Sequence, residues 1–106
     1  MMSANLQKTI KEPIEFVGVG LHNGIKANLC LKPAEPNSGI KFKRVDLENT
    51  KNIIEANYNN VSSAVLCTMI KNSYGATVST VEHLMAAFYL EGIDNILVEI
   101  DAPEVP

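Results

Sequence analysis

An acidic residue and a histidine stand side by side at positions 82 and 83, and they are the pair in this chain best suited to chemistry. A carboxylate such as that of Glu82 can act as a general base, and a neutral imidazole such as that of His83 can bind a metal ion. Both fall within residues 78–88, where we predict the first turn of a helix. The sequence therefore indicates a candidate site at the beginning of that helix.

Each of the two residues also has a purely structural interpretation. Ser79 and Glu82 fit the capping-box pattern S-x-x-E, in which the acid bonds back to the backbone and only starts the helix. His83 alone cannot hold a catalytic zinc ion, which usually takes three protein ligands. The H-E-x-x-H pattern, which would supply a second ligand one turn along the helix, is absent. Spacing alone leaves both interpretations open.

The predicted helix has two apolar faces. A stripe at the i, i+3, i+4, i+7 spacing is expected to face the core and consists of Val81, Leu84, Met85 and Phe88. A helix in contact with water usually carries charged residues on its other side. Here that side has only a histidine and small or apolar residues: His83, Ala86, Ala87 and Leu90. We therefore expect another structure to cover this second face.

The composition is that of one small, slightly acidic domain. A chain of 106 residues can bury one modest core, and its formal net charge is -3. Because positive and negative charges are interspersed, nucleic acid is not an expected partner. No apolar run is long enough for a transmembrane segment, and residues 1–10 lack the hydrophobic core of a signal peptide. We expect a cytoplasmic protein in which Cys30 and Cys67 are reduced thiols.

Alternating apolar residues predict strands on both sides of this helix. We expect a strand over 6–16 that Pro13 interrupts, continuing to a hairpin turn at 22–24, where Asn-Gly is a strong turn signal. Gly92 suits the end of the helix, and residues 46–63 give only a weak signal. Further strands are expected at 25–32, 40–45, 65–70, 76–78 and 95–100. The sum predicts an α+β two-layer sandwich, with a mainly antiparallel sheet and a helix layer on one face.

Residues 101–106 follow the last predicted strand directly, without the polar tail or docking helix that commonly finishes a domain. This ending agrees with the second apolar face of the helix, which needs a cover. We expect residues 1–106 to be the N-terminal domain of a longer protein, with a second domain absent from this sequence.

Five short blocks occur in a distinctive order: GVGLHNG at 18–24, LCT at 66–68, STVEHL at 79–84, GIDNI at 92–96 and APEVP at 102–106. In order and spacing they closely resemble the N-terminal domain of the UDP-3-O-acyl-N-acetylglucosamine deacetylase family. The resemblance extends from about residue 6 over nearly the whole chain. It is far more specific than a single Glu-His pair.

The resemblance implies a zinc-dependent amide hydrolase of lipid A biosynthesis that removes the acetyl group of UDP-3-O-acyl-N-acetylglucosamine. By resemblance, Glu82 is the general base and His83 is a Zn2+ ligand. His22 matches a position near the cleft, although as the first residue of a hairpin turn it also has a structural interpretation. The segment that resembles the substrate-binding wall, near the mouth of the acyl-chain passage, consists of Leu66, Cys67 and Thr68.

The same resemblance implies that this chain holds only part of the site. In the family the remaining zinc ligands lie in an H-x-x-x-D helix of a second domain, and the two domains stack helix layer against helix layer as a β-α-α-β sandwich. We therefore expect the missing C-terminal domain as a partner and no activity from this part alone. The alternative is a non-catalytic binding or assembly module, with Glu82 as a helix cap and His83 as a packing residue.

Overall fold

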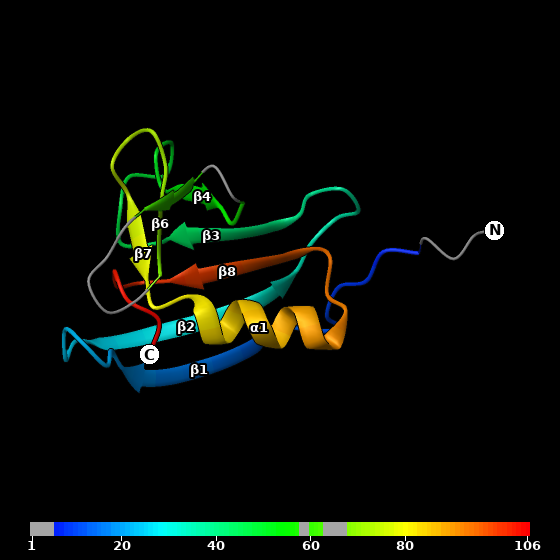
Figure 1. Ribbon diagram of the computed structural model, residues 1–106, viewed down its shortest axis with the longest axis horizontal. Helices are drawn as coiled ribbons and strands as arrows, with labels where there is room; N and C mark the ends of the chain where they lie inside the picture. Colours follow the sequence, from blue (N-terminus) through cyan, green and yellow to red (C-terminus); the bar gives the residue numbers. More distant parts are fainter. Residues whose placement is uncertain (1–5, 58–59, 63–67) are drawn as a thin grey trace.

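The computed structural model describes residues 6–57, 60–62 and 68–106, and it is mixed α+β as the sequence predicts (Figure 1). Its elements are β1 (Ile14–Val19), β2 (Lys26–Pro33), β3 (Ile40–Arg44), β4 (Ile53–Glu55), β5 (Val61–Ser62), β6 (Met69–Lys71), β7 (Thr77–Ser79), α1 (Glu82–Glu91) and β8 (Ile96–Ile100). Among the described residues, no helical segment has the length and hydrophobicity that a bilayer crossing requires.

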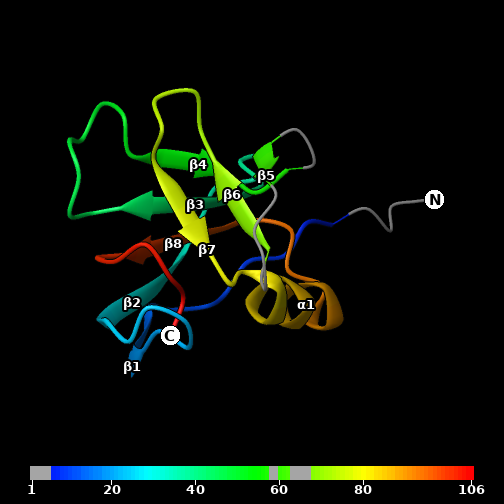
Figure 2. The ribbon, with the colours of Figure 1, turned by 60° about the vertical axis from the view of Figure 1, so that its left-hand side comes forward.

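The strands form two sheets. The larger sheet has the order β1-β2-β8-β3-β4, in which every pair is antiparallel except β3 with β8. The smaller sheet has the order β5-β6-β7 and is antiparallel. Figures 1 and 2 show α1 lying along one face of the larger sheet, with the smaller sheet beside β3 and β4. The predicted sandwich is confirmed, although the sequence did not predict a separate small sheet.

The core lies between the larger sheet on one side and α1 together with the smaller sheet on the other. In β8 the side chains of Ile96, Val98 and Ile100 are fully buried, because this central strand has a neighbour on each side and α1 lies over this face. Leu29 and Leu31 continue the same face in β2. The period-two prediction is confirmed for these strands.

Buried Arg44 joins the two sheets. Its Nη1 donates to the carbonyl oxygen of Thr77 in β7 at 2.8 Å, and its Nε and Nη2 donate to the Asp46 carboxylate at 2.9 and 2.7 Å. The guanidinium is therefore paired on both sides, as a buried charge requires. This contact fixes β7, the strand that leads to α1, against the larger sheet.

The predicted strand over 6–16 is wrong in its first half, because β1 begins only at Ile14. Residues 6–13 are instead held by the loop after α1: Lys8 N–H donates to Asp94 Oδ2 at 2.8 Å, and Asp94 N–H donates to the Lys8 carbonyl at 2.9 Å. Pro13 lacks the N–H that would continue the β1 ladder, so the chain leaves the sheet at that point.

The helix begins later than the capping box requires, so that prediction is wrong. Ser79 lies in β7 and Thr80 has a φ of 60°, while Val81 is the N-cap and makes no side-chain capping hydrogen bond. Glu82 is thus the first helical residue and not the third. The predicted helix end is confirmed, because Gly92 has a φ of 70° and its N–H bonds to the Tyr89 carbonyl as in a Schellman motif.

Candidate active site

The two carboxylate oxygens of Glu82 have different surroundings. Oε2 accepts a hydrogen bond from the Thr68 backbone N–H at 3.1 Å. Oε1 is buried and has no hydrogen-bond partner among the described residues. A buried carboxylate oxygen without a donor is costly in a folded protein, and such atoms are common at sites that bind something further. The structure therefore brings together Glu82 and Thr68, two of the residues that the sequence predicts for the site. It leaves Oε1 of Glu82 without a partner among the described residues.

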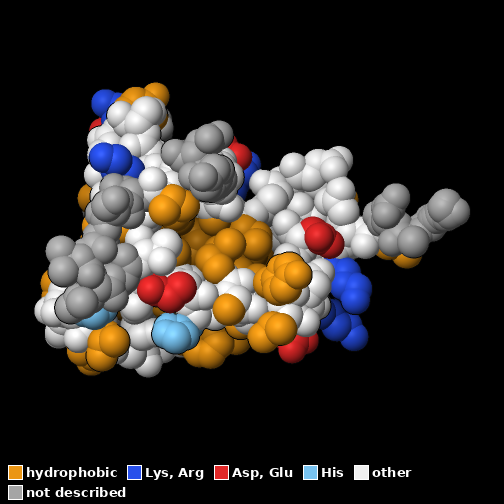
Figure 3. Space-filling model, viewed as in Figure 1, with side chains coloured by type: hydrophobic (Ala, Val, Ile, Leu, Met, Phe, Trp, Pro, Cys, Tyr) orange, Lys and Arg blue, Asp and Glu red, His pale blue; other side chains and the backbone are white. Residues whose placement is uncertain are grey.

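His83 is exposed and lies on the wall of a groove of about 370 Å³ between α1 and the β1 edge of the larger sheet. Besides the imidazole, the groove is lined mainly by apolar residues: Phe16, Val17, Gly18, Leu29, Leu84, Ala87, Val105 and Pro106. In Figure 3 an acidic and a histidine side chain lie side by side at the beginning of α1, with apolar side chains beyond them.

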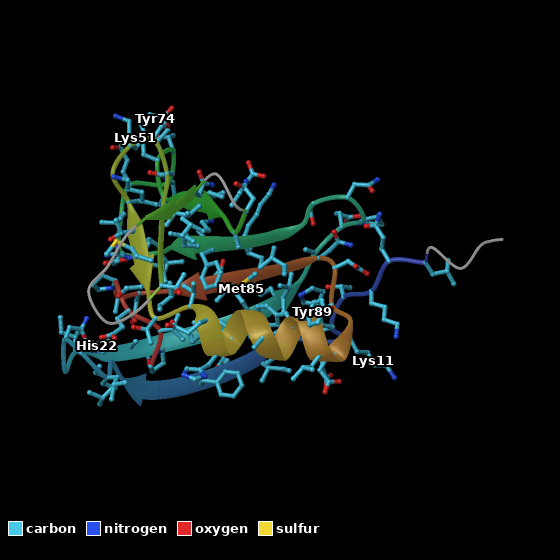
Figure 4. The ribbon with its side chains drawn as sticks, in the orientation of Figure 1. Lys11, His22, Lys51, Tyr74, Met85 and Tyr89 are labelled. Carbon is cyan, nitrogen blue, oxygen red and sulfur yellow. The ribbon has the colours of Figure 1, made fainter. Side chains whose placement is uncertain are left out.

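The second face of the helix is as apolar and exposed as the sequence predicts. Val81 and Phe88 are buried against the sheet, whereas Ala86, Ala87 and Leu90 are exposed and Leu90 is 81% accessible. Figure 4 shows Met85 and Tyr89 along α1, and Tyr89 is exposed as well. Ala87 belongs both to this exposed side of α1 and to the lining of the groove.

His22 is a member of the turn between β1 and β2, and Figure 4 places it at the tip of this hairpin. Its backbone N–H donates to both carboxylate oxygens of Glu104, each at 3.1 Å. The described contacts of His22 are therefore those of a turn residue. Leu66 and Cys67, two of the three predicted wall residues, lie outside the described residues.

Glu104 is a functional candidate that the sequence analysis missed. Only 1% of its surface is accessible, yet its carboxylate is well satisfied by N–H and O–H donors. Burial raises the pKa of this carboxyl, but hydrogen bonds from Thr80, Asn23 and His22 outweigh burial and lower the pKa below its usual value. The signal in the sequence was an acid placed between two prolines in an otherwise apolar segment, at 102–106.

The described residues do not form a complete metal site. No group of three His, Cys, Asp or Glu side chains lies close enough together, in the ranges 6–57, 60–62 and 68–106, to hold an ion. Cys30 is a free thiol on β2, as expected. A zinc site with the usual three protein ligands that included His83 would therefore need donors beyond these residues.

Comparison of the sequence with known proteins shows which family this chain is similar to. Over residues 7–106 the chain matches the profile of the LpxC family, described as UDP-3-O-acyl N-acetylglycosamine deacetylase. It is 49% identical over 100 residues to the UDP-3-O-acyl-N-acetylglucosamine deacetylases of Haemophilus influenzae strain PittEE and Histophilus somni strain 129Pt. It is 48% identical to the protein of that name from Pasteurella multocida strain Pm70.

The alignments cover a much larger fraction of this chain than of its relatives. The alignments take in 94% of this chain but 32% of each of these relatives. The chain therefore spans about a third of the length of the curated relatives it matches.

Proposed function

The chain belongs to the UDP-3-O-acyl N-acetylglycosamine deacetylase family, and from this premise we propose that residues 1–106 are the N-terminal domain of such an enzyme. The proposed reaction is hydrolysis of the acetamide of UDP-3-O-acyl-N-acetylglucosamine to acetate and the free amine, a step of lipid A biosynthesis. The proposed compartment is the cytoplasm, where a free thiol such as that of Cys30 persists.

The observation that supports this proposal most is that Oε1 of Glu82 has no hydrogen-bond partner in the described parts of the chain. Because Oε2 is held by the Thr68 N–H, the carboxylate has a fixed orientation and one oxygen free to take a proton from the attacking water. The absence of a capping bond removes the main support for the alternative, a non-catalytic module in which Glu82 is a helix cap.

His83 is proposed as a ligand of Zn2+: its imidazole is exposed, and it directly follows Glu82, whose Oε1 has no hydrogen-bond partner among the described residues. When bound, zinc would supply Lewis-acid activation of water near neutral pH. One ring nitrogen of His83 would coordinate the ion, and the remaining protein ligands would come from a second domain.

The substrate and the second domain are proposed to occupy the apolar side of α1. The second domain would pack its own helix layer on Ala86, Ala87 and Leu90, and the resulting cleft would end at Glu82 and His83. Thr68 lies beside Glu82, as a wall residue should, and Leu66 and Cys67 are proposed to continue that wall.

Glu82→Gln in the complete protein tests the proposed function. The amide retains the shape of the side chain but cannot take a proton, so deacetylation should slow by about 10²–10⁴-fold with zinc content and melting temperature preserved. Glu91→Gln, at the exposed far end of the same helix, is the matched control and should leave the rate unchanged. His83→Ala should lower zinc content. Normal acetate release by Glu82→Gln would refute the catalytic role.

A further inference from the structure

The carboxylate of Glu104 joins two segments that are far apart in the chain. Its Oε1 accepts the Asn23 N–H at 2.9 Å, and both of its oxygens accept the His22 N–H. Its Oε2 also accepts the Thr80 hydroxyl at 2.6 Å. A charge this deeply buried is retained only when its oxygens are well satisfied. Glu104 therefore links the β1–β2 turn to the residues that precede α1.

Thr80 forms the elbow between β7 and α1. Its φ of 60° is a left-handed conformation that a threonine adopts only when its surroundings hold it there. The hydroxyl bond to Glu104 is one such restraint. The other is the pairing of Ser79 with residues 103–105: Ser79 N–H donates to the Pro103 carbonyl at 2.8 Å, and Val105 N–H donates to the Ser79 carbonyl at 3.1 Å. Two residues after this elbow the chain reaches Glu82.

Where the β1–β2 turn meets Glu104, there is no room for a side chain on Gly20. A Cβ atom on Gly20 would collide with Glu104 Oε1 and with Asn23 Oδ1. Neither atom can move freely, because the first accepts two backbone N–H groups and the second accepts the Ile25 N–H at 2.9 Å. The position of the Glu104 carboxylate is therefore fixed by the turn, and the elbow is fixed by the carboxylate.

We propose that Glu104 is a positioning residue, which holds the Thr80 elbow and thereby sets where Glu82 and His83 lie at the start of α1. The carboxylate is buried and does not touch the groove, so it acts through Thr80 and not on substrate. This inference rests on the proposed function, since it concerns the geometry of the same base and ligand.

Glu104→Met in the complete protein is the first test. It preserves the length of the side chain but removes every acceptor for Thr80, His22 and Asn23. A displacement of about 1 Å at a catalytic group costs on the order of 10²-fold in rate, so kcat should fall about 10–100-fold while KM changes less than about threefold. Glu104→Gln retains a carbonyl acceptor, and its amide can donate to the rotated Thr80 hydroxyl, so most of kcat should return.

Thr80 variants isolate the elbow from the hairpin. Thr80→Val removes only the hydroxyl and should lower kcat as Glu104→Met does, whereas Thr80→Ser should retain activity. Combining Glu104→Met with Thr80→Val should cost little more than either alone, because both break one contact. Fully additive losses would show that Glu104 does not act through Thr80.

Asp101→Leu is the matched control. Asp101 also accepts a backbone N–H and a side-chain amide, both from Asn28 at 2.7 and 2.8 Å, but it has no contact with the elbow. Its loss should lower the melting temperature and leave kcat unchanged. An equal fall in kcat for Asp101→Leu and Glu104→Met, or an unchanged kcat in Glu104→Met, would overturn the proposal.

A second readout separates this inference from the proposed function. In nuclear magnetic resonance spectra of this chain, Thr80→Val should shift the amide resonances of Glu82 and His83, and Asp101→Leu should not. Unmoved resonances would refute the positioning role even if Glu82→Gln abolishes deacetylation. Shifted resonances in a protein whose Glu82→Gln variant is fully active would support the positioning role and refute the proposed function.

Discussion

At the scale of single residues, the carboxylates of Glu104, which is buried, and Glu82, which is half-buried, differ in how their oxygens are satisfied. Glu104 is surrounded by donors, while Glu82 retains one oxygen without a partner among the described residues. The first arrangement stabilises a fold and the second favours a reaction, since an unsatisfied buried oxygen gains from any ligand that supplies a proton or a positive charge.

The lowered pKa of Glu104 predicts how stability depends on pH. Its pKa in the folded state lies below the usual glutamate value of 4.5, so its stabilising contribution is fully present above about pH 4.5 and is lost as pH falls through the pKa of the folded state. The groups facing it are the Thr80 hydroxyl and the His22 turn. Glu104→Gln should therefore make the free energy of unfolding, measured with urea, fall less steeply as the pH is lowered below about 4.5. An equally steep fall in the variant and in the unchanged chain would contradict the ionised state of Glu104.

The sequence predicted that Glu82 and His83 lie at the start of a helix, but it predicted neither the hydrogen bonds of Glu104 nor Val81 as the N-cap. The capping-box prediction used four adjacent residues, whereas the observed elbow depends on a contact between Thr80 and Glu104, 24 residues apart. A hydrogen bond between residues so far apart in the sequence can outweigh the local preference of residues 79–82 for a capping box. A short sequence pattern cannot predict such a bond. His83 was placed correctly on the exposed helix face because helical periodicity is local.

At the scale of elements, the β1–β2 hairpin and the segment at 101–106 are packed as one unit. The hairpin was predictable because Asn-Gly and period-two alternation are strong signals. The contact of Gly20 with Glu104 was not, because it depends on where a distant side chain comes to lie.

A pair of glycine substitutions tests this packing. Gly20→Ala should destabilise the chain by about 1–3 kcal/mol, because the added carbon meets two fixed oxygens. Gly24→Asn should cost less than about 1 kcal/mol, since Gly24 has a φ of 69° with open space around it, and asparagine tolerates that conformation. Chemical unfolding measures both. Equal costs would mean that the hairpin can move away from Glu104.

At the scale of the whole molecule, no described part of the chain covers the exposed apolar face of α1 formed by Ala86, Ala87 and Leu90. We expect the isolated chain to self-associate or to bind a hydrophobic dye, because soluble monomers rarely expose such a surface. Leu90→Glu should reduce association without lowering the melting temperature, since Leu90 is 81% accessible. Sedimentation showing a monomer at high concentration, together with no dye binding, would argue against a missing partner.

The proposed division of the zinc site between two domains makes a separate prediction about metal binding. With His83 as the one matched ligand, this chain should bind zinc far more weakly than a site with three protein ligands. Isothermal titration calorimetry measures this directly. One tight site at a one-to-one ratio would contradict a site completed by another domain.

The position of β8 in the larger sheet also determines when the fold can form. This strand lies between β2 and β3 and supplies three fully buried core residues, yet it comes after every other described element in the chain. A ribosome adding about 5–20 residues per second needs several seconds between finishing β2 and finishing β8. During that interval β2 and β3 have unpaired edges, and pairings between distant segments are slow to form. The nascent chain is therefore most exposed to chaperones and proteases just before Ile96–Ile100 emerges.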